Sequence, residues 1–180
     1  LGRLCVKEVG MPKKDQGHNE VVMDVRVHTK ITKGGRQLSF ASLAAVGDGQ
    51  GSVGIGYGKA PGVPAAIEKA TTRAQETMQE IGMVGDTVAH ETVGEHGSSE
   101  VIIRPASRGT GVKAGATVGA IMSAAGIHNV LTKCVGPTNP LNVAKATFKA
   151  LTEMRTAEEV EQLRGVKVQM DHPQLAEQGA

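Results

Sequence analysis

The chain has 180 residues, enough for one large or two small domains, and 39% of them are hydrophobic, which predicts a packed core. Its net charge of +2 is too small to identify a partner. Aromatic residues make up only 2%, which excludes the platform of rings on which binders of single-stranded nucleic acid stack bases. No apolar run approaches the roughly 20 residues of a membrane span.

The first half of the chain predicts a polar tail followed by three strands and a helix. Val21–Thr32 alternates apolar and polar side chains, Gly34-Gly35 is a hairpin turn signal, and Gln37–Val46 is the returning strand. A second glycine turn at 48–51 leads to a third strand, Ser52–Tyr57. Pro64 then opens a helix that Gly82 ends. The predicted apolar stripe of that helix comprises Ile67, Ala70, Ala74, Met78 and Ile81.

The second half predicts the order β-β-α-β-α. A linker, Gly82–Asp86, precedes short strands near His90–Glu95 and Glu100–Pro105. The loop Pro105–Gly111 leads to a helix, Ala114–Ala125, which Gly126 ends, and to a strand, Asn129–Val135. Asn139-Pro140 starts a last helix with its buried stripe at Leu141, Ala144, Phe148 and Leu151. We therefore predict an α+β fold with domains at 21–85 and 86–165 and tails at 1–20 and 166–180.

No motif predicts catalysis. The segment from Gly49 to Gly54 fits GxGxxG, but it leads into a strand and not into the helix that a dinucleotide site requires. The six histidines are scattered without HxH or HExxH spacing. The two cysteines, Cys5 and Cys134, form no CxxC pair, so we expect a reducing compartment. We expect no catalytic residue, no metal and no cofactor.

The charge distribution points to a polyanion. Residues 21–59 carry five basic and two acidic groups, and residues 101–150 carry six basic groups and no acidic one. Two basic blocks of this kind indicate two surfaces that face nucleic acid, with chance clustering on solvated faces as the alternative. The predicted RNA-binding residues are Arg26, Lys30, Lys33, Gly34, Gly35, Arg36, Gly49, Gly51, Lys59, Lys113, Lys133 and Lys145.

The segment Lys33-Gly34-Gly35-Arg36 is the sharpest of these signals. Glycines permit positive φ and bring backbone N–H groups close to a ligand, and two flanking cations can straddle phosphates. The alternative is a solvated hairpin tip whose cations discourage edge pairing. The other basic residues nearby favour a structured RNA that is recognised by its shape and backbone.

The chain resembles the universal small-subunit ribosomal protein five family, of bacterial or organellar type, in four motifs. These are KGGR at 33–36, SFASLAAVGDGQGSVGIGYGKA at 39–60, PASRGTG at 105–111 and GIHNVLTKCVGPTNPLNVAKATFKAL at 126–151. The resemblance covers residues 21–165. It implies a double-stranded-RNA-binding-like N-terminal domain and a C-terminal domain of the family's domain-2-like type.

The resemblance also implies partners. These are 16S-type rRNA of the small subunit, ribosomal proteins four and eight, and mRNA in the region where it enters. In the family the first hairpin approaches the rRNA of the head–body neck, and the surface near PASRGTG contacts protein four and influences decoding accuracy. The implied protein-interface residues are Arg104, Ser107, Arg108, Gly109 and Gly111.

The chain departs from the family pattern at Ser52, Glu100 and Gly119, where arginine is common, and its pI of 8.6 is low for the family. Weakened charge is typical of a diverged ribosome. Because the chain also begins with Leu1, we expect a removed leader and favour the mitochondrial matrix over a bacterial cytoplasm or a plastid.

The sequence thus predicts a structural constituent of the small ribosomal subunit that binds rRNA and supports translational accuracy, and not an enzyme. One alternative is a free-standing protein that binds structured RNA. A remote alternative, resting on GxGxxG alone, is a nucleotide-dependent enzyme.

Overall fold

The computed structural model describes residues 18–166, so the expected tails at 1–20 and 166–180, and Cys5, lie almost entirely outside the described residues. Within this range, two four-stranded sheets, one two-stranded sheet and four helices confirm the predicted α+β class. No helix in this part of the chain is both long enough and apolar enough to cross a membrane.

The first sheet is antiparallel and has the order β1-β2-β3-β4. Its strands are β1 (Asn19–Thr32), β2 (Gly35–Gly47), β3 (Ser52–Ala60) and β4 (Gln79–Glu80). The predicted hairpin and third strand are confirmed. The predicted alternation over Val21–Thr32 implies one apolar face along β1, and this is wrong, because a register shift between Val22 and Asp24 moves the later apolar residues to the other face. Val21 and Met23 therefore pack against the central core, whereas Val27 is exposed.

Helix α1 (Val63–Glu76) lies directly on β3, because three alternate residues of that strand are glycines. A β carbon on any of them would overlap a carbonyl oxygen of the helix. The contacts pair Gly54 with Ala74, Gly56 with Ala70, and Gly58 with Ala66. All three alanines are fully buried. The glycines of β3 thus serve close packing between helix and sheet.

Helix α1 ends one and a half turns before the position that its apolar pattern predicts. Glu76 is its last residue, and the hydroxyl of Thr77 donates to the carbonyl of Ile55 (2.9 Å). Ile81 lies beyond the helix and packs into the core, with its N–H donating to the carbonyl of Gly51 (2.8 Å). The prediction that Gly82 ends the helix is therefore wrong.

The second half of the chain forms a sheet of order β7-β8-β10-β9 with helices on one face. Its strands are β7 (Thr92–His96), β8 (Ser99–Pro105), β9 (Val112–Lys113) and β10 (Val130–Val135), and its helices are α2 (Ala116–Ala125), α3 (Pro140–Glu153) and α4 (Ala157–Arg164). Gly126 ends α2 with φ 86°, as predicted. The predicted linker instead forms part of a small hairpin, β5 (Met83–Val84) with β6 (Thr87–Val88).

The buried side of α3 differs slightly from the predicted stripe. Ala144 and Leu151 are buried as expected, but Leu141 and Phe148 are only half-buried. The other buried residues of α3 are Val143, Ala146, Thr147 and Ala150. Asn139 precedes the helix, but its side chain makes no capping hydrogen bond.

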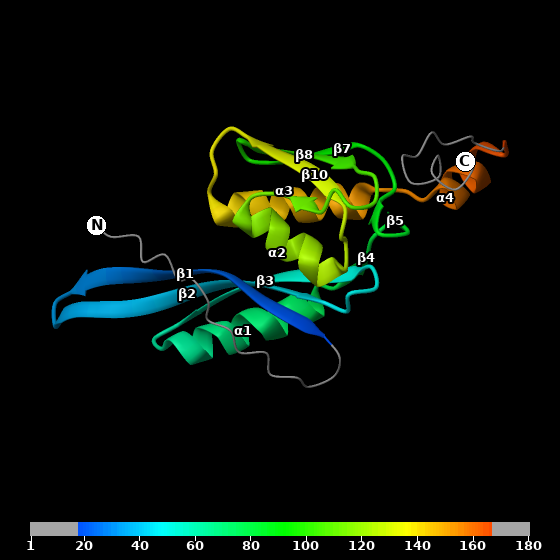
Figure 1. Cartoon of the computed structure of the whole chain (residues 1–180). Helices are drawn as coiled ribbons and strands as arrows, with labels where there is room; N and C mark the ends of the chain where they lie inside the picture. Colours follow the sequence, from blue (N-terminus) through cyan, green and yellow to red (C-terminus); the bar gives the residue numbers. More distant parts are fainter. Residues whose placement is uncertain (1–17, 167–180) are drawn as a thin grey trace.

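The elements stack in four layers: the second sheet, helices α2 and α3, the first sheet, and α1 (Figure 1). One apolar cluster joins Leu43 and Val53 of the first sheet to Ile121 and Met122 of α2. The first sheet is therefore covered by α1 on one face and, away from the β1–β2 turn, by α2 on the other. The domain boundaries at 85 and 165 stay a prediction.

Candidate nucleic-acid interface

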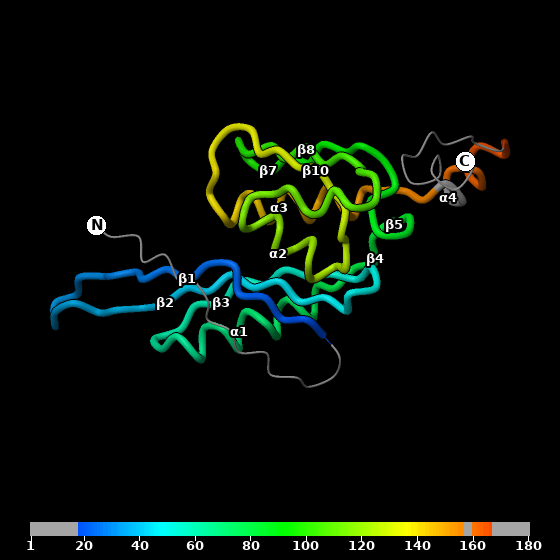
Figure 2. Tube along the Cα trace, viewed as in Figure 1, coloured from blue at the N-terminus to red at the C-terminus, as the bar shows by residue number. Residues whose placement is uncertain are grey.

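The hairpin β1–β2 extends beyond the rest of the first sheet as a free arm. Strand β3 pairs with β2 only between Gly47 and Phe40, whereas β1 pairs with β2 as far as Thr32 and Gly35. Residues 26–38, which we call the arm, are all exposed. Figure 2 shows the arm projecting past β3 and α1. A two-stranded projection of this kind leaves both faces open to a partner.

Strand register separates the arm's cations into groups. Arg26 lies opposite Ala41, which lies opposite Lys59, so both basic residues are on one face of the sheet. Lys30 follows Arg26 by four residues and shares that face. Lys33 is in the turn at the tip, and Arg36 lies opposite Ile31 on the other face with Val27 and Leu38. The structure thus brings Arg26, Lys30 and Lys59 together and places Arg36 apart from them.

The arm has little internal charge compensation. No acidic residue occurs between Val25 and Gly47. Arg26 pairs through Nε with Oδ2 of Asp24 at 2.7 Å, but both side chains are partly exposed and such a pair contributes little stability. Lys30, Lys33 and Arg36 make no ion pair with any residue of the described range. These three charges are free to meet phosphates.

The tip differs from its predicted geometry. Thr32 pairs with Gly35, so Lys33 and Gly34 are the two turn residues and Gly35 begins β2. Only Gly35 has a positive φ, at 118°. The freedom of glycine to adopt positive φ is therefore used at Gly35 and not at Gly34. The hydroxyl of Thr32 donates to the carbonyl of Gly35 (3.0 Å), which holds the turn closed.

The turn after β2 is tied to α2, and this changes the reading of Gly49 and Gly51. The Gly49 N–H donates to the carbonyl of Ala124 (3.1 Å), and the Gly51 N–H donates to that of Ala125 (3.0 Å). Both amides are already used within the chain, so they have no free N–H to offer to RNA. A side chain on Gly126 would overlap the Gly49 carbonyl, which shows how closely the turn and the helix end meet.

Asp48 fixes the same turn. Its Oδ1 accepts hydrogen bonds from the N–H groups of Gln50 (2.8 Å) and Ser52 (3.0 Å). Partial burial raises the pKa of the Asp48 carboxyl, but these hydrogen bonds outweigh burial and hold the pKa below its usual value. The carboxylate therefore acts as a structural acceptor.

The PASRGTG loop is held by two side chains that the sequence patterns did not single out. The Thr87 hydroxyl accepts from the N–H of Ala106 (3.3 Å), and Oδ1 of Asn129 accepts from that of Gly111 (3.1 Å). Both side chains are buried. No sequence motif marks Thr87, and Asn129 has only its place beside the predicted strand.

The predicted protein-interface residues all lie in or beside this loop. Gly109 and Gly111 have φ of 85° and 73°, so the loop conformation favours glycine at both. Arg104 pairs with Glu91 (Nε–Oε1 2.7 Å), and Arg108 lies 4.0 Å from Asp86 (Nε–Oδ2). The Ser107 and Thr110 hydroxyls are 3.3 Å apart. Both ion pairs are largely exposed, whereas the Ser107–Thr110 pair is partly buried. The charged side chains of the loop are therefore accessible.

The remaining predicted lysines do not join the arm. Lys113 is on β9 and Lys133 on β10, both exposed on the second sheet, and Lys145 is exposed on α3. Beside Lys133, burial raises the pKa of the Cys134 thiol although the lysine's charge lowers it. The second basic block is therefore spread over several elements.

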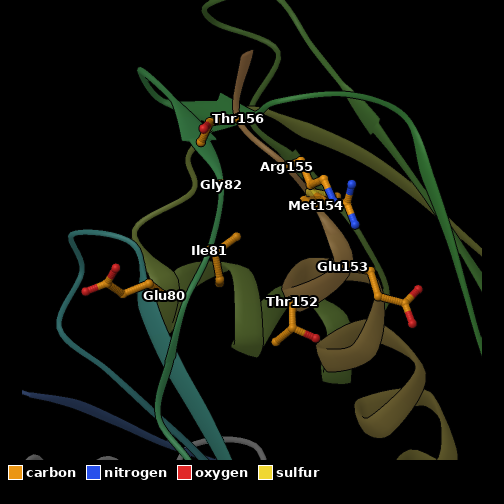
Figure 3. Close-up of a pocket in the computed structure, with 8 residues that line it drawn as sticks. All are labelled: Glu80, Ile81, Gly82, Thr152, Glu153, Met154, Arg155 and Thr156. Carbon is orange, nitrogen blue, oxygen red and sulfur yellow. The ribbon is translucent and has the colours of Figure 1, made fainter. Parts of the chain in front are cut away.

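A pocket of about 690 Å³ lies where the connection after β4 passes the end of α3 (Figure 3). Its lining is Glu80, Ile81, Gly82, Thr152, Glu153, Met154, Arg155 and Thr156. It contains no histidine or cysteine and none of the predicted site residues. Among residues 18–166 no group of three or more His, Cys, Asp or Glu side chains is arranged to hold a metal.

Two family models match the chain. The model described as "Ribosomal protein S5, N-terminal domain" matches residues 18–82, and that described as "Ribosomal protein S5, C-terminal domain" matches residues 94–164. The chain belongs to the ribosomal protein S5 family. This confirms the resemblance on which the sequence analysis rests, and the fold class with it.

Bacterial relatives in the ribosomal protein S5 family match most of the chain. A protein named small ribosomal subunit protein uS5 from Rubrobacter xylanophilus is 48% identical over 88% of this chain and 81% of its own length. Proteins of the same name from Idiomarina loihiensis and Syntrophobacter fumaroxidans are 48% and 52% identical, over 83% and 77% of this chain and 90% and 84% of theirs.

Membership of the ribosomal protein S5 family bears on the alternative of a nucleotide-dependent enzyme and on the predicted mitochondrial location. The family is not an enzyme class, and the GxGxxG segment runs into β3 and packs against α1. The nucleotide-dependent enzyme therefore loses the motif on which it rested. The relatives named above are bacterial and give no support to a mitochondrial location, which stays a prediction.

Proposed function

We propose that this chain is a structural constituent of the small ribosomal subunit and binds its 16S-type rRNA through the arm. The observation that carries the proposal is the free two-stranded projection with three cations that no carboxylate among residues 18–166 neutralises. The names of its bacterial relatives support the same assignment.

The arm favours recognition of RNA shape and backbone. Its side chains supply cations for phosphates, and the described sheet has no set of aromatic residues on which bases could stack. Lys30 and Lys59 approach from one face, Lys33 from the tip and Arg36 from the other face. A projection with cations on both faces suits insertion between RNA segments.

The further partners extend this proposal. We assign the PASRGTG loop, with Arg104, Ser107, Arg108, Gly109 and Gly111, to the contact with ribosomal protein four and to translational accuracy. Contacts with protein eight and with mRNA where it enters belong to the same proposal. The anchored and accessible loop supports a protein contact, because its shape is set before a partner arrives.

The test compares two double variants of equal charge change. Lys30→Ala with Lys33→Ala removes two free cations of the arm, and Lys69→Ala with Arg164→Ala removes two exposed cations elsewhere. Affinity for a duplex-containing rRNA fragment is measured at several salt concentrations. We expect the arm variant to bind more weakly and its log–log salt slope to fall by about 0.9 per lost phosphate contact, while the control variant is unchanged.

Stability and assembly complete the test. The free energies of unfolding of both variants should lie within about 0.5 kcal/mol of that of the parent protein, because exposed turn and surface charges contribute little to stability.

The parent should co-sediment with small subunits after a high-salt wash, whereas a free-standing RNA-binding protein would be washed away. Equal RNA affinity of the two variants would show that the arm is not the binding element.

A further inference from the structure

A histidine lies among the cations of the arm. Arg26, His28 and Lys30 are alternate residues of β1, so their side chains lie on one face of the hairpin, which we call the cationic face. The ring of His28 is exposed and has no hydrogen-bond or ion-pair partner among residues 18–166. Ser39 lies directly opposite, but its hydroxyl donates to the backbone carbonyl of His28 (3.4 Å) and not to the ring. The imidazole is therefore free to bind a ligand.

The surroundings of the ring are cationic or neutral. Arg26 and Lys30 flank it along β1, each two residues and so roughly 7 Å away. Asp24 is the carboxylate nearest to His28 along β1, and it pairs with Arg26. Residues 26–38 are all exposed, so no helix covers the ring. The residues of β2 and β3 on the cationic face are Gln37, Ser39, Ala41 and Lys59.

A nucleic acid strand that meets both Arg26 and Lys30 passes over His28. The two cations are about 13 Å apart along the extended strand, and the imidazole lies midway between them. A neutral imidazole offers phosphate one N–H donor, while the lone pair on its other nitrogen repels the phosphate oxygens. Protonation makes both ring nitrogens donors and gives the hydrogen bond to phosphate the strength of a charge-assisted one. A phosphate at this position therefore favours the protonated ring.

We propose that His28 binds a backbone phosphate of the RNA and takes up a proton from solvent as it does so. Histidine is the side chain that ordinarily changes its charge between about pH 5 and 8. Because the complex then holds more protons than the separate partners, a lower pH in this range favours the complex. This inference rests on the proposed function, to which it adds a binding residue and a dependence on pH.

The affinity of the full chain for a duplex-containing rRNA fragment without a terminal phosphate, measured between about pH 5.5 and 8, tests the inference. The parent should bind roughly tenfold more tightly at the lower pH, the effect of one hydrogen bond to a charged group. His28→Gln should lose this pH dependence and bind weakly throughout, whereas His28→Lys should bind tightly throughout. His90→Gln removes an exposed histidine outside the arm and should behave as the parent. Circular dichroism at each pH checks that every variant is folded.

Proton uptake provides a second readout. Calorimetric titrations with the same RNA, in buffers of different ionisation enthalpy, should show more protons bound by the parent and by His90→Gln than by His28→Gln. Equal uptake, or an equal pH dependence of affinity in parent and His28→Gln, overturns the inference and shows a solvated histidine that does not contact RNA. The proposed function still stands in that case if Lys30→Ala with Lys33→Ala weakens binding. If that double variant binds as tightly as the parent, the proposed function fails, and the comparison at position 28 still decides the inference.

Discussion

The α carbon of Gly56 lies against the backbone carbonyl of Ala70, so closely that a β carbon at position 56 would overlap its oxygen. Ala70 is the central residue of the face that α1 turns towards β3, and it is fully buried. At this point the distance between helix and sheet is thus set by the absence of a methyl group, as it is at Gly54 and Gly58. The contact involves backbone on the helix side, which no side-chain rotation can relieve.

Gly56→Ala should therefore destabilise the protein by about 1–3 kcal/mol or more, as expected for overpacking of a filled core. Gly34→Ala is the matched control, because nothing lies within 4 Å of that position and its φ is not positive. Urea denaturation of both variants measures the difference. Equal stability would mean that α1 moves away from β3 without cost.

The tip of the arm provides a second pair of glycines that the structure distinguishes. Gly35 has φ 118°, and Gly34 lies outside the positive-φ region, although neither has a neighbour that a β carbon would meet. Gly35→Ala should cost on the order of 1 kcal/mol through backbone strain alone, and Gly34→Ala less than about 0.5 kcal/mol. Thermal denaturation compares them. A larger loss at position 34 would contradict the observed turn.

The sequence predicts the hairpin, the third strand and the end of α2 because each depends on local signals such as alternation and glycine position. It does not reveal where α1 ends, because Met78 and Ile81 continue the helical spacing while tertiary contacts of Thr77 and Ile81 stop the helix. Periodicity alone cannot separate a buried helix residue from a buried residue just beyond the helix.

The candidate site shows the same division. The cations of the arm are evident from the sequence, but their faces depend on strand register, which separates Arg36 from Lys30. From the sequence alone, Gly49 and Gly51 are predicted to offer free backbone N–H groups near a basic turn. Their hydrogen bonds to α2 join residues more than seventy positions apart, and no local pattern encodes such a contact. Thr87 and Asn129 were missed for the same reason.

Ionised Asp48 makes the free energy of unfolding depend on pH. Because its pKa is lower in the folded chain than in the unfolded one, its contribution is complete above the ordinary value of 3.8 and is lost as pH falls through the lower folded value. Asp48→Ala removes the acceptor for two N–H groups. We expect the stability difference between parent and variant to be constant near neutral pH and to shrink below about pH 4. A difference independent of pH in that range would show that ionised Asp48 is not the acceptor.

The anchor of the PASRGTG loop gives the last prediction. Asn129→Ala removes the oxygen that accepts from the Gly111 N–H, and an unmatched amide costs about 1 kcal/mol or more. We therefore expect faster hydrogen exchange at Gly111 and, on the proposed function, an altered misreading rate at unchanged subunit abundance. Asn129→Asp retains an acceptor and should restore slow exchange. Thr72→Ala on α1 is the control, because this exposed side chain lies outside the loop and its hydroxyl donates to the carbonyl of Glu68 within the helix. If Asn129→Ala speeds exchange but leaves misreading unchanged, the loop's shape does not determine accuracy.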